Sequence, residues 1–171
     1  WALVTGASSG IGREFCVQLA QNGVNLVLVA RREALLLDLS RELSAQHQVQ
    51  CVPVVADLAV AGGPEHVHAV VSKMGIHPRL LVNNAAFGRC GHFSRASAAD
   101  YAHMMMLNAV APVVLCRLFE EDLGRHASAA VINVSSPAVF QPVPYMAAYA
   151  ASKCAMHSFS LALSEEWRSK S

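Results

Sequence analysis

Tyr149 and Lys153 are the two residues of this sequence whose types and spacing best suit acid–base chemistry. They are four residues apart, so on a helix they lie one above the other on the same face. An ammonium beside a phenol stabilises the phenolate, which lets the tyrosine give or accept a proton at a substrate oxygen. Such a pair also occurs by chance on helix surfaces. Tyr145 is a second tyrosine of interest, but no lysine follows it at that spacing, and we expect it to line a pocket.

A glycine-rich segment near the amino end is suited to binding a phosphate. Residues 5–12 read TGASSGIG, after a short apolar stretch and before a helical pattern. Glycines let the backbone approach a pyrophosphate, and the following helix offers free N–H groups and a partial positive charge. An ordinary strand-to-helix turn is the alternative, but the strand before and the helix after favour a dinucleotide site. The contacts expected in this turn are Gly6, Ser8, Ser9, Gly10, Ile11 and Gly12.

Two arginines indicate which dinucleotide the site prefers. The next strand is expected to end at Ala30, about 20 residues past the glycines, where NAD sites carry a carboxylate for the ribose 2′-hydroxyl. Arg31 and Arg32 stand there instead, ahead of Glu33. A guanidinium suits a 2′-phosphate, so we predict that NADP(H) is preferred over NAD(H), with Arg31 as the main contact and Arg32 beside it. A solvated helix start without a ligand is the alternative.

Alternating segments along the chain must position these residues. Strands are expected at Trp1–Thr5, Val24–Ala30, Val49–Val55, Arg79–Asn83 and Ala129–Val134. Helices are expected at Gly10–Gln21, Glu33–Gln46, Gly62–Met74, Ser97–Gly124 and Ala147–Lys170. This alternation predicts an α/β fold, a Rossmann-type doubly wound parallel sheet flanked by helices, as a single NAD(P)-binding domain over residues 1–171. Ligands of such sheets bind at the carboxyl ends of the strands.

Together the motifs resemble the short-chain dehydrogenase/reductase family over essentially all 171 residues. The family pattern T-G-x-x-x-G-x-G is met at residues 5–12, and residues 83–86 read NNAA where the family has N-N-A-G. Ala86 therefore replaces a glycine, which places an extra methyl near the cofactor. The resemblance implies further cofactor contacts at Asp57, Leu58, Asn83, Ala85, Tyr149 and Lys153.

The resemblance also assigns the catalytic residues. Ser136 lies 13 residues before Tyr149, which is the family's spacing, and is expected to hydrogen-bond the substrate oxygen. Lys153 is expected to contact the nicotinamide ribose hydroxyls as well as Tyr149. Asn108 matches a fourth catalytic residue, although a buried asparagine with local partners is the alternative. Pro112 lacks an N–H, so we predict that the Asn108 carbonyl is free and the helix bent there, with a water passing protons to Lys153.

The expected substrate loops are rich in apolar side chains. Phe87–Ala96 and Pro137–Ala148 lie beside the catalytic residues and indicate a fairly apolar ketone or secondary alcohol. The runs at residues 1–6 and 25–29 are similar to the hydroxysteroid dehydrogenase and long-chain ketoacyl reductase branch. The sequence thus predicts an NADP(H)-dependent oxidoreductase that transfers a hydride. The alternative is a non-catalytic dinucleotide-binding or regulatory protein on the same fold.

Composition restricts the partners. The chain is 54% hydrophobic and 15% charged with a net charge of +1. Its longest apolar stretches are short of the ~18 residues that cross a membrane, and Met104–Cys116 is broken by Asn108 and Pro112, so no span is predicted. No basic stripe suggests nucleic acid, and the eight histidines show no zinc spacing, so no metal is predicted. The five cysteines form no C-x-x-C pair and are expected to be mostly small core residues. They indicate a reducing intracellular compartment, by default the cytoplasm.

The resemblance implies two more strands and a helix after Ser171. We therefore expect the fold to be C-terminally incomplete, with the strand Ala129–Val134 at an exposed edge and the 171-residue piece aggregation-prone and at best weakly active. The first residue is Trp1, so a segment could precede it. In the full-length form we expect a homodimer or homotetramer built through the two long helices, with a small-molecule carbonyl or alcohol as substrate.

Overall fold

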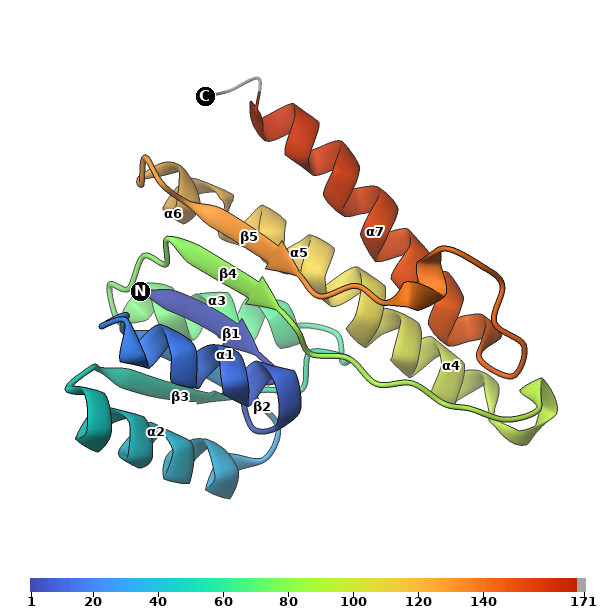
Figure 1. Ribbon diagram of the computed structural model, residues 1–171, viewed down its shortest axis with the longest axis horizontal. Coiled ribbons are helices and arrows are strands. Elements are labelled where there is room, and N and C mark those ends of the chain that lie inside the picture. Colours follow the sequence, from blue (N-terminus) through green and yellow to red (C-terminus); the bar gives the residue numbers. More distant parts are fainter. Residues whose placement is uncertain (169–171) are drawn as a thin grey trace.

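The computed structural model describes residues 1–168, which form five strands and seven α-helices in alternation (Figure 1). The strands are β1 (Ala2–Thr5), β2 (Leu26–Ala30), β3 (Cys51–Val55), β4 (Leu80–Asn83) and β5 (Ala130–Asn133). The helices are α1 (Gly10–Gln21), α2 (Glu33–His47), α3 (Gly63–Lys73), α4 (Ala98–Met105), α5 (Ala111–Leu118), α6 (Glu120–Gly124) and α7 (Ala147–Arg168). Short helical turns are η1 (Phe93–Arg95), η2 (Met106–Val110) and η3 (Pro137–Val139). The predicted end of the last helix at Lys170 lies outside the described residues.

All five strands pair in parallel in the order β3-β2-β1-β4-β5. The chain begins in the middle of the sheet at β1, moves outward to β3, and then crosses back to β4 on the other side of β1. The order therefore reverses between β1 and β4, and in open sheets of this kind ligands bind at that point. The predicted doubly wound parallel sheet is confirmed.

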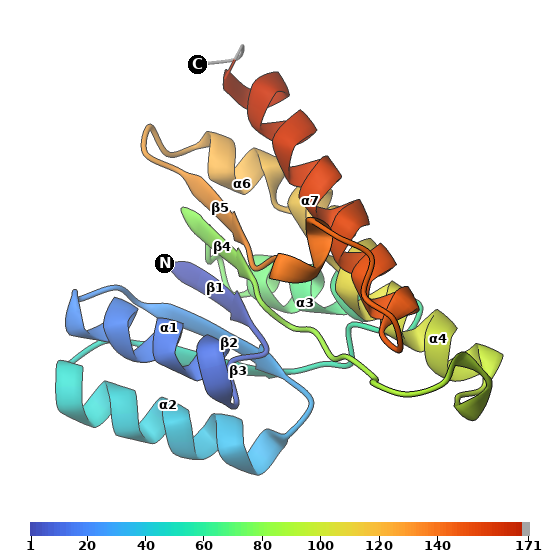
Figure 2. The same cartoon turned by 45° about the vertical axis from the view of Figure 1, so that its right-hand side comes forward.

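Helices cover the two faces of this sheet, as Figure 2 shows, and an apolar cluster fills the space on each face. On one face α1 and α2 pack on β1 and β2, and their buried side chains are Cys16, Ala20, Leu36, Leu39 and Leu43. On the other face lie α3, α5 and α7, through Val67, Val71, Ala111, Leu115, Cys116, Phe159 and Leu163. Because both faces are covered, β1 and β2 are buried nearly throughout, which explains why they read as continuous apolar runs.

The predicted single helix Ser97–Gly124 is wrong in its continuity. A capping box begins this helix, because Ser97 Oγ accepts from the Asp100 N–H at 3.1 Å and Asp100 Oδ2 accepts from the Ser97 N–H at 3.1 Å. A π-helical turn then interrupts the α-helix at η2, where the Ala111 N–H donates to the Met106 carbonyl five residues earlier. This turn directly precedes Pro112 in α5, the place where an α-helix would lose a donor. The free carbonyl of Asn108 stays a prediction.

Residues 98–118 are long and apolar enough to cross a membrane by length and composition, with a mean hydropathy of 1.3. Core helices of soluble proteins pass the same test. These residues pack against α3 and α7 and bury Met104 and Leu115 in the interior. The absence of a span stays a prediction, and this packing favours it.

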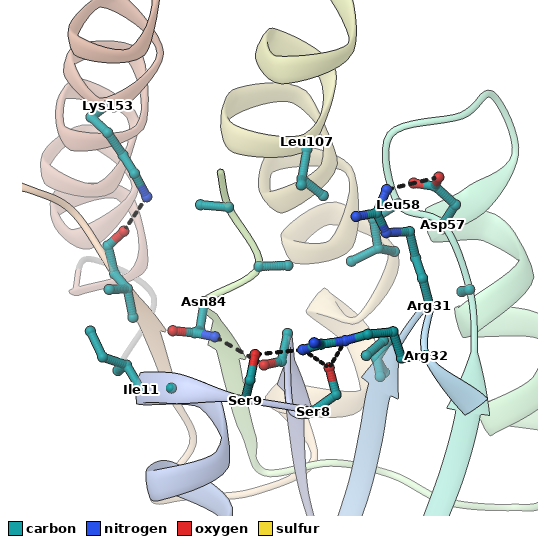
Figure 3. Close-up of a pocket in the computed structure, with 18 of the residues that line it drawn as sticks. Ser8, Ser9, Ile11, Arg31, Arg32, Asp57, Leu58, Asn84, Leu107 and Lys153 are labelled. Atoms are coloured by element: carbon teal, nitrogen blue, oxygen red, sulfur yellow. Dashed lines mark hydrogen bonds and ion pairs between the residues drawn. The ribbon is translucent and has the colours of Figure 1, made fainter. Parts of the chain in front are cut away.

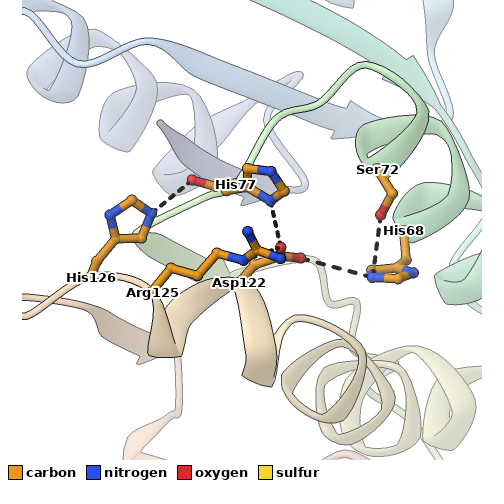
Figure 4. Close-up of polar contacts among 6 residues, drawn as sticks. All are labelled: His68, Ser72, His77, Asp122, Arg125 and His126. Carbon is orange, nitrogen blue, oxygen red and sulfur yellow. Dashed lines mark hydrogen bonds and ion pairs between the residues drawn. The ribbon is translucent and has the colours of Figure 1, made fainter.

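The helix α6 is fastened to α3 by a group of polar side chains at the opposite edge of the sheet from the strands' carboxyl ends (Figure 4). Asp122 is at its centre, with 11% of its side chain exposed. Its carboxylate lies 2.6 Å from His77 Nδ1, 3.9 Å from His68 Nε2 and 3.8 Å from Arg125 Nε. These contacts hold α6 against α3 and the segment that follows it.

At the edge of the described sheet, β5 pairs only with β4, as predicted for this strand. Ala130 and Ile132 are exposed on one of its faces.

The expectation that the cysteines are mostly small core residues is wrong in part. All five cysteines are free, but only Cys16 and Cys116 are buried, whereas Cys90 and Cys154 are exposed.

Candidate functional site

A cavity of about 630 Å³ opens at the carboxyl ends of the strands, where the sheet order reverses (Figure 3). Twelve residues predicted to bind a cofactor line it: Gly6, Ser8, Ser9, Gly10, Ile11, Arg31, Arg32, Asp57, Leu58, Ala85, Tyr149 and Lys153. Other lining residues include Asn84, Ala86, Leu107, Val134 and Ser135. Residues from both halves of the chain therefore meet around one space.

The glycine-rich turn has the conformation that its residues allow. Gly6 and Gly10 have φ values of 68° and 57°, a region that favours glycine. Gly12 does not line the cavity. A Cβ there would collide with the Gly6 carbonyl oxygen and Asn84 Nδ2, so this glycine allows the helix to pack closely against the turn. The amino end of α1 thus faces the cavity with its free N–H groups.

Thr5 and Asn84 join the ends of β1 and β4; both belong to motifs found in the sequence, but neither was among the predicted contacts. Thr5 Oγ1 accepts from the N–H groups of Asn84 and Ala85, both at 3.0 Å, and Asn84 Nδ2 donates to the Thr5 carbonyl at 2.9 Å. Asn83, a predicted cofactor contact, does not line the cavity. It is 5% exposed, and its Nδ2 donates to Asn133 Oδ1 at 2.8 Å. The position of Thr5 directly before Gly6 is the sequence signal that could have identified it as part of the site.

The two arginines differ in their surroundings. Arg32 donates to Ser9 Oγ at 2.6 Å and to Ser8 Oγ at 2.9 Å, which brings one guanidinium and two hydroxyls together at one end of the cavity (Figure 3). Arg31 instead lies 3.7 Å from Asp57 Oδ2 and its side chain is 61% exposed. Arg32, rather than Arg31, is therefore the centre of the polar group formed with the glycine-rich turn.

Tyr149 and Lys153 lie at the other end of the cavity on α7. Lys153 is 4% exposed and its Nζ donates to the Val134 carbonyl at 2.8 Å, just after β5. Burial lowers the pKa of Lys153 from its usual value. Ser136 lines an adjoining cavity of about 500 Å³ that also contains Tyr149. Tyr149 is therefore shared by the two cavities.

Asn108 is buried at 1% exposure, and its side-chain amide is engaged on two sides. Its Oδ1 accepts from the Phe87 N–H at 3.1 Å, and its Nδ2 donates to the Phe87 carbonyl at 2.8 Å. The same Nδ2 donates to Ser152 Oγ at 3.1 Å, and Ser152 Oγ donates to the Tyr149 carbonyl at 2.7 Å. The side chain of Asn108 thus holds the segment after β4 against α7, beside Tyr149.

Tyr145 connects the two predicted substrate loops. Its carbonyl accepts from the Gly91 N–H at 2.9 Å, and its ring lies edge-on to His92 with centroids 5.1 Å apart. Its φ of 65° is unusual for a residue with a side chain.

Among residues 1–168, no three His, Cys, Asp or Glu side chains are grouped so that they could hold a metal ion.

A doubly wound parallel sheet with a glycine-rich turn at its reversal point defines a Rossmann-type protein. The sequence model of the short chain dehydrogenases matches residues 1–171, and the chain belongs to this family. The predicted family is confirmed.

Curated relatives include members of the predicted branch. Hydroxysteroid dehydrogenase-like protein 1 of Gallus gallus is 32% identical over 99% of this chain and 52% of its own length. Very-long-chain 3-oxoacyl-CoA reductase of Bos taurus is 29% identical over 99% of this chain and 55% of its own. The chain spans about half the length of these relatives.

Solved structures agree with the fold. An alcohol dehydrogenase from Comamonas testosteroni described as specific for bulky-bulky ketones superposes with a TM-score of 0.91 at 30% identity, over 99% of this chain and 68% of that one. A short-chain dehydrogenase from Sphingobium yanoikuyae in complex with NADPH superposes with a TM-score of 0.88 at 30% identity, over 96% of this chain and 64% of that one.

Proposed function

We propose that this chain carries the cofactor-binding and proton-transfer residues of an NADP(H)-dependent oxidoreductase that interconverts a fairly apolar ketone and a secondary alcohol. One observation carries the proposal. A single cavity has the Arg32–Ser8–Ser9 group at one end and Tyr149 with Lys153 at the other. NADP(H) has its groups in a matching order, with a phosphate-bearing ribose at one end and the reactive nicotinamide ring at the other.

The donors around the cavity fit NADP(H). Arg32 with the hydroxyls of Ser8 and Ser9 suits a 2′-phosphate, because a guanidinium forms strong charge-assisted hydrogen bonds to phosphate oxygens. The amino end of α1 suits the pyrophosphate. The complexes of similar proteins with NADPH or NADP support this assignment. Asp57 and Leu58 would flank the adenine, and Lys153 the nicotinamide ribose.

A bound reduced nicotinamide would supply a hydride to the carbonyl carbon of the ketone. Tyr149 donates its phenolic proton to the carbonyl oxygen, so the substrate becomes an alcohol and the tyrosine a phenolate. Lys153, which is itself buried, stabilises that phenolate by its charge. Its ammonium has three N–H groups, and the bond to the Val134 carbonyl uses one of them.

Ser136 has the remaining role at the substrate oxygen. Its Oγ accepts from the Ala138 N–H at 3.2 Å, which occupies a lone pair and leaves the hydroxyl hydrogen to be donated. In the cavity it shares with Tyr149, that hydrogen can reach the same carbonyl oxygen. The other residues lining this cavity, apart from Cys90 and Gly88, are apolar: Ala86, Phe87, Ala138 and Met146. This lining supports an apolar ketone.

The rival function is a non-catalytic dinucleotide-binding or regulatory protein. The test uses the full-length protein, with NADPH oxidation followed in the presence of apolar ketones. Tyr149→Phe should reduce turnover about 10²–10⁴-fold and leave NADPH affinity nearly unchanged. Tyr101→Phe, which removes only a hydroxyl bonded to the Phe93 carbonyl, is the matched control and should keep its turnover. A wild type without ketone-dependent oxidation would favour the rival, and substantial turnover in Tyr149→Phe would remove Tyr149 from its role.

Assembly as a homodimer or homotetramer remains part of this proposal. Val110, Val113 and Leu161 are exposed on η2, α5 and α7, the helices expected to meet a partner copy. Sedimentation of the full-length protein would measure its oligomeric state.

A further inference from the structure

Gly88 follows β4 and lies against the ring of the proposed catalytic tyrosine. Its φ is not in the positive region where side chains are disfavoured. The backbone at this position would therefore accept an ordinary residue, and the reason for a glycine must be the space around it.

That space is filled on one side by the ring of Tyr149. A Cβ built on Gly88 would lie 3.0 Å from Tyr149 Cδ2 and 3.3 Å from Tyr149 Cε2. It would also lie 3.4 Å from Met146 Cε, the end of a flexible side chain. The Met146 contact is ordinary, but the contact with the ring is tighter than real Cβ atoms generally make, so either the ring or the backbone would have to move.

The backbone on both sides of this contact is held by hydrogen bonds. The Asn108 amide holds both the N–H and the carbonyl of Phe87, the residue directly before Gly88. The same amide bonds to Ser152, which is fully buried and donates to the Tyr149 carbonyl. The backbones at Gly88 and Tyr149 are thus connected through one buried amide, which sets the distance between them.

Gly88 also lines the cavity of about 500 Å³ that contains Ser136 and Tyr149. A side chain at this position would stand between the Tyr149 ring and Met146, in the lining of the cavity that Ser136 and Tyr149 share. A substrate whose carbonyl oxygen is held by those hydroxyls places its substituents in or next to this cavity, which Gly88 lines.

We propose that Gly88 is a specificity-determining residue, whose missing side chain makes room for a large substituent next to the reacting carbon. This inference rests on the proposed function, and it narrows the substrate class to ketones and secondary alcohols with a bulky, apolar group on at least one side of the oxygen. A methyl group at position 88 would narrow the lining of this cavity and press on the Tyr149 ring.

The test measures binding in a complex that cannot react, the full-length protein with NADPH and a secondary alcohol. Benzhydrol is the bulky probe, because both of its substituents are phenyl rings, and isopropanol is the compact probe. Gly88→Ala should weaken benzhydrol about tenfold or more relative to isopropanol, and Gly88→Val more strongly, because overfilling a packed site is unfavourable. If Gly88→Val does not fold, Gly88→Ala carries the test. Gly124→Ala is the matched control, since a Cβ there meets nothing within 4 Å. Its ratio of the benzhydrol and isopropanol dissociation constants should equal that of the wild type.

The outcomes separate this inference from the proposed function. An unchanged ratio of the two dissociation constants in Gly88→Ala overturns the inference, and so does a wild type that binds neither alcohol. An equal loss for both probes also overturns it, because a displaced Tyr149 ring would then explain the result. The expected ratio in a protein that fails to reduce any ketone would support the role of Gly88 and overturn only the proposed function.

Discussion

The guanidinium of Arg32 is the group on which the choice between NADPH and NADH is expected to depend. The two cofactors differ by the 2′-phosphate, and Arg32 already contacts Ser8 Oγ and Ser9 Oγ at 2.9 and 2.6 Å. A hydrogen bond to a charged group contributes about 1.5–3 kcal/mol. Because Arg32 is exposed, solvent screening favours the lower end, about 1.5–2 kcal/mol. Arg32→Ala should therefore weaken NADPH about 10–30-fold and NADH by much less.

Arg31 should matter less than was predicted from its position in the sequence. Its guanidinium lies 3.7 Å from the Asp57 carboxylate, which offsets part of its charge. We expect Arg31→Ala to weaken NADPH about threefold or less. Arg41→Ala is the control for a lost surface charge, because Arg41 is 76% exposed and pairs only with Asp38 in the described structure.

The assay is a fluorescence titration of both cofactors against the wild type and the three arginine variants. It is repeated at higher salt, where the contribution of an exposed charge should shrink. An equal loss of NADPH and NADH affinity in Arg32→Ala would refute the reasoning. A larger discrimination effect in Arg31→Ala would show that the free structure does not identify the phosphate contact.

Two further predictions concern stability. Asp122→Asn removes the charge facing His77 and should lower the free energy of unfolding by about 1–3 kcal/mol, whereas Asp38→Asn on the surface should change it by less than about 0.5 kcal/mol. Urea unfolding of both variants measures these free energies. Equal changes in the two variants would contradict the role given to Asp122. Burial lowers the pKa of Lys153 below its ordinary 10.5, so the unfolded chain keeps this proton to higher pH than the folded protein. Stability should then rise with pH between the lowered pKa and 10.5 relative to Lys153→Met, and parallel pH curves of the unfolding free energy would contradict this.

The order and type of the elements were predictable because they depend on local signals. Apolar runs such as Leu26–Ala30 identify strands buried on both faces, and the Ser97 capping box identifies a helix start. Residues 5–12 and the spacing of Tyr149 and Lys153 likewise located both ends of the cavity. Each of these signals lies within a few residues of sequence, so it can be recognised without knowing the fold.

Other features depend on which way a side chain points at the end of an element. Arg31 and Arg32 are neighbours of the same type, yet only Arg32 reaches the glycine-rich turn. Asn83 and Asn84 are likewise identical, but Asn83 turns into the interior and Asn84 lines the cavity. Adjacent residues on a strand point to opposite faces of the sheet. An error of one position in the predicted end of a strand therefore assigns each of the two neighbours the direction of the other.

Sequence alone determined that this chain forms a doubly wound sheet with a dinucleotide turn and a tyrosine–lysine pair. The tertiary structure alone decided that Gly88 meets the ring of Tyr149, that Asn108 holds Phe87, and that Asp122 fastens α6. Each of these contacts joins residues that are far apart in the chain. No local pattern records such a contact, because it exists only after the sheet and its helices have packed.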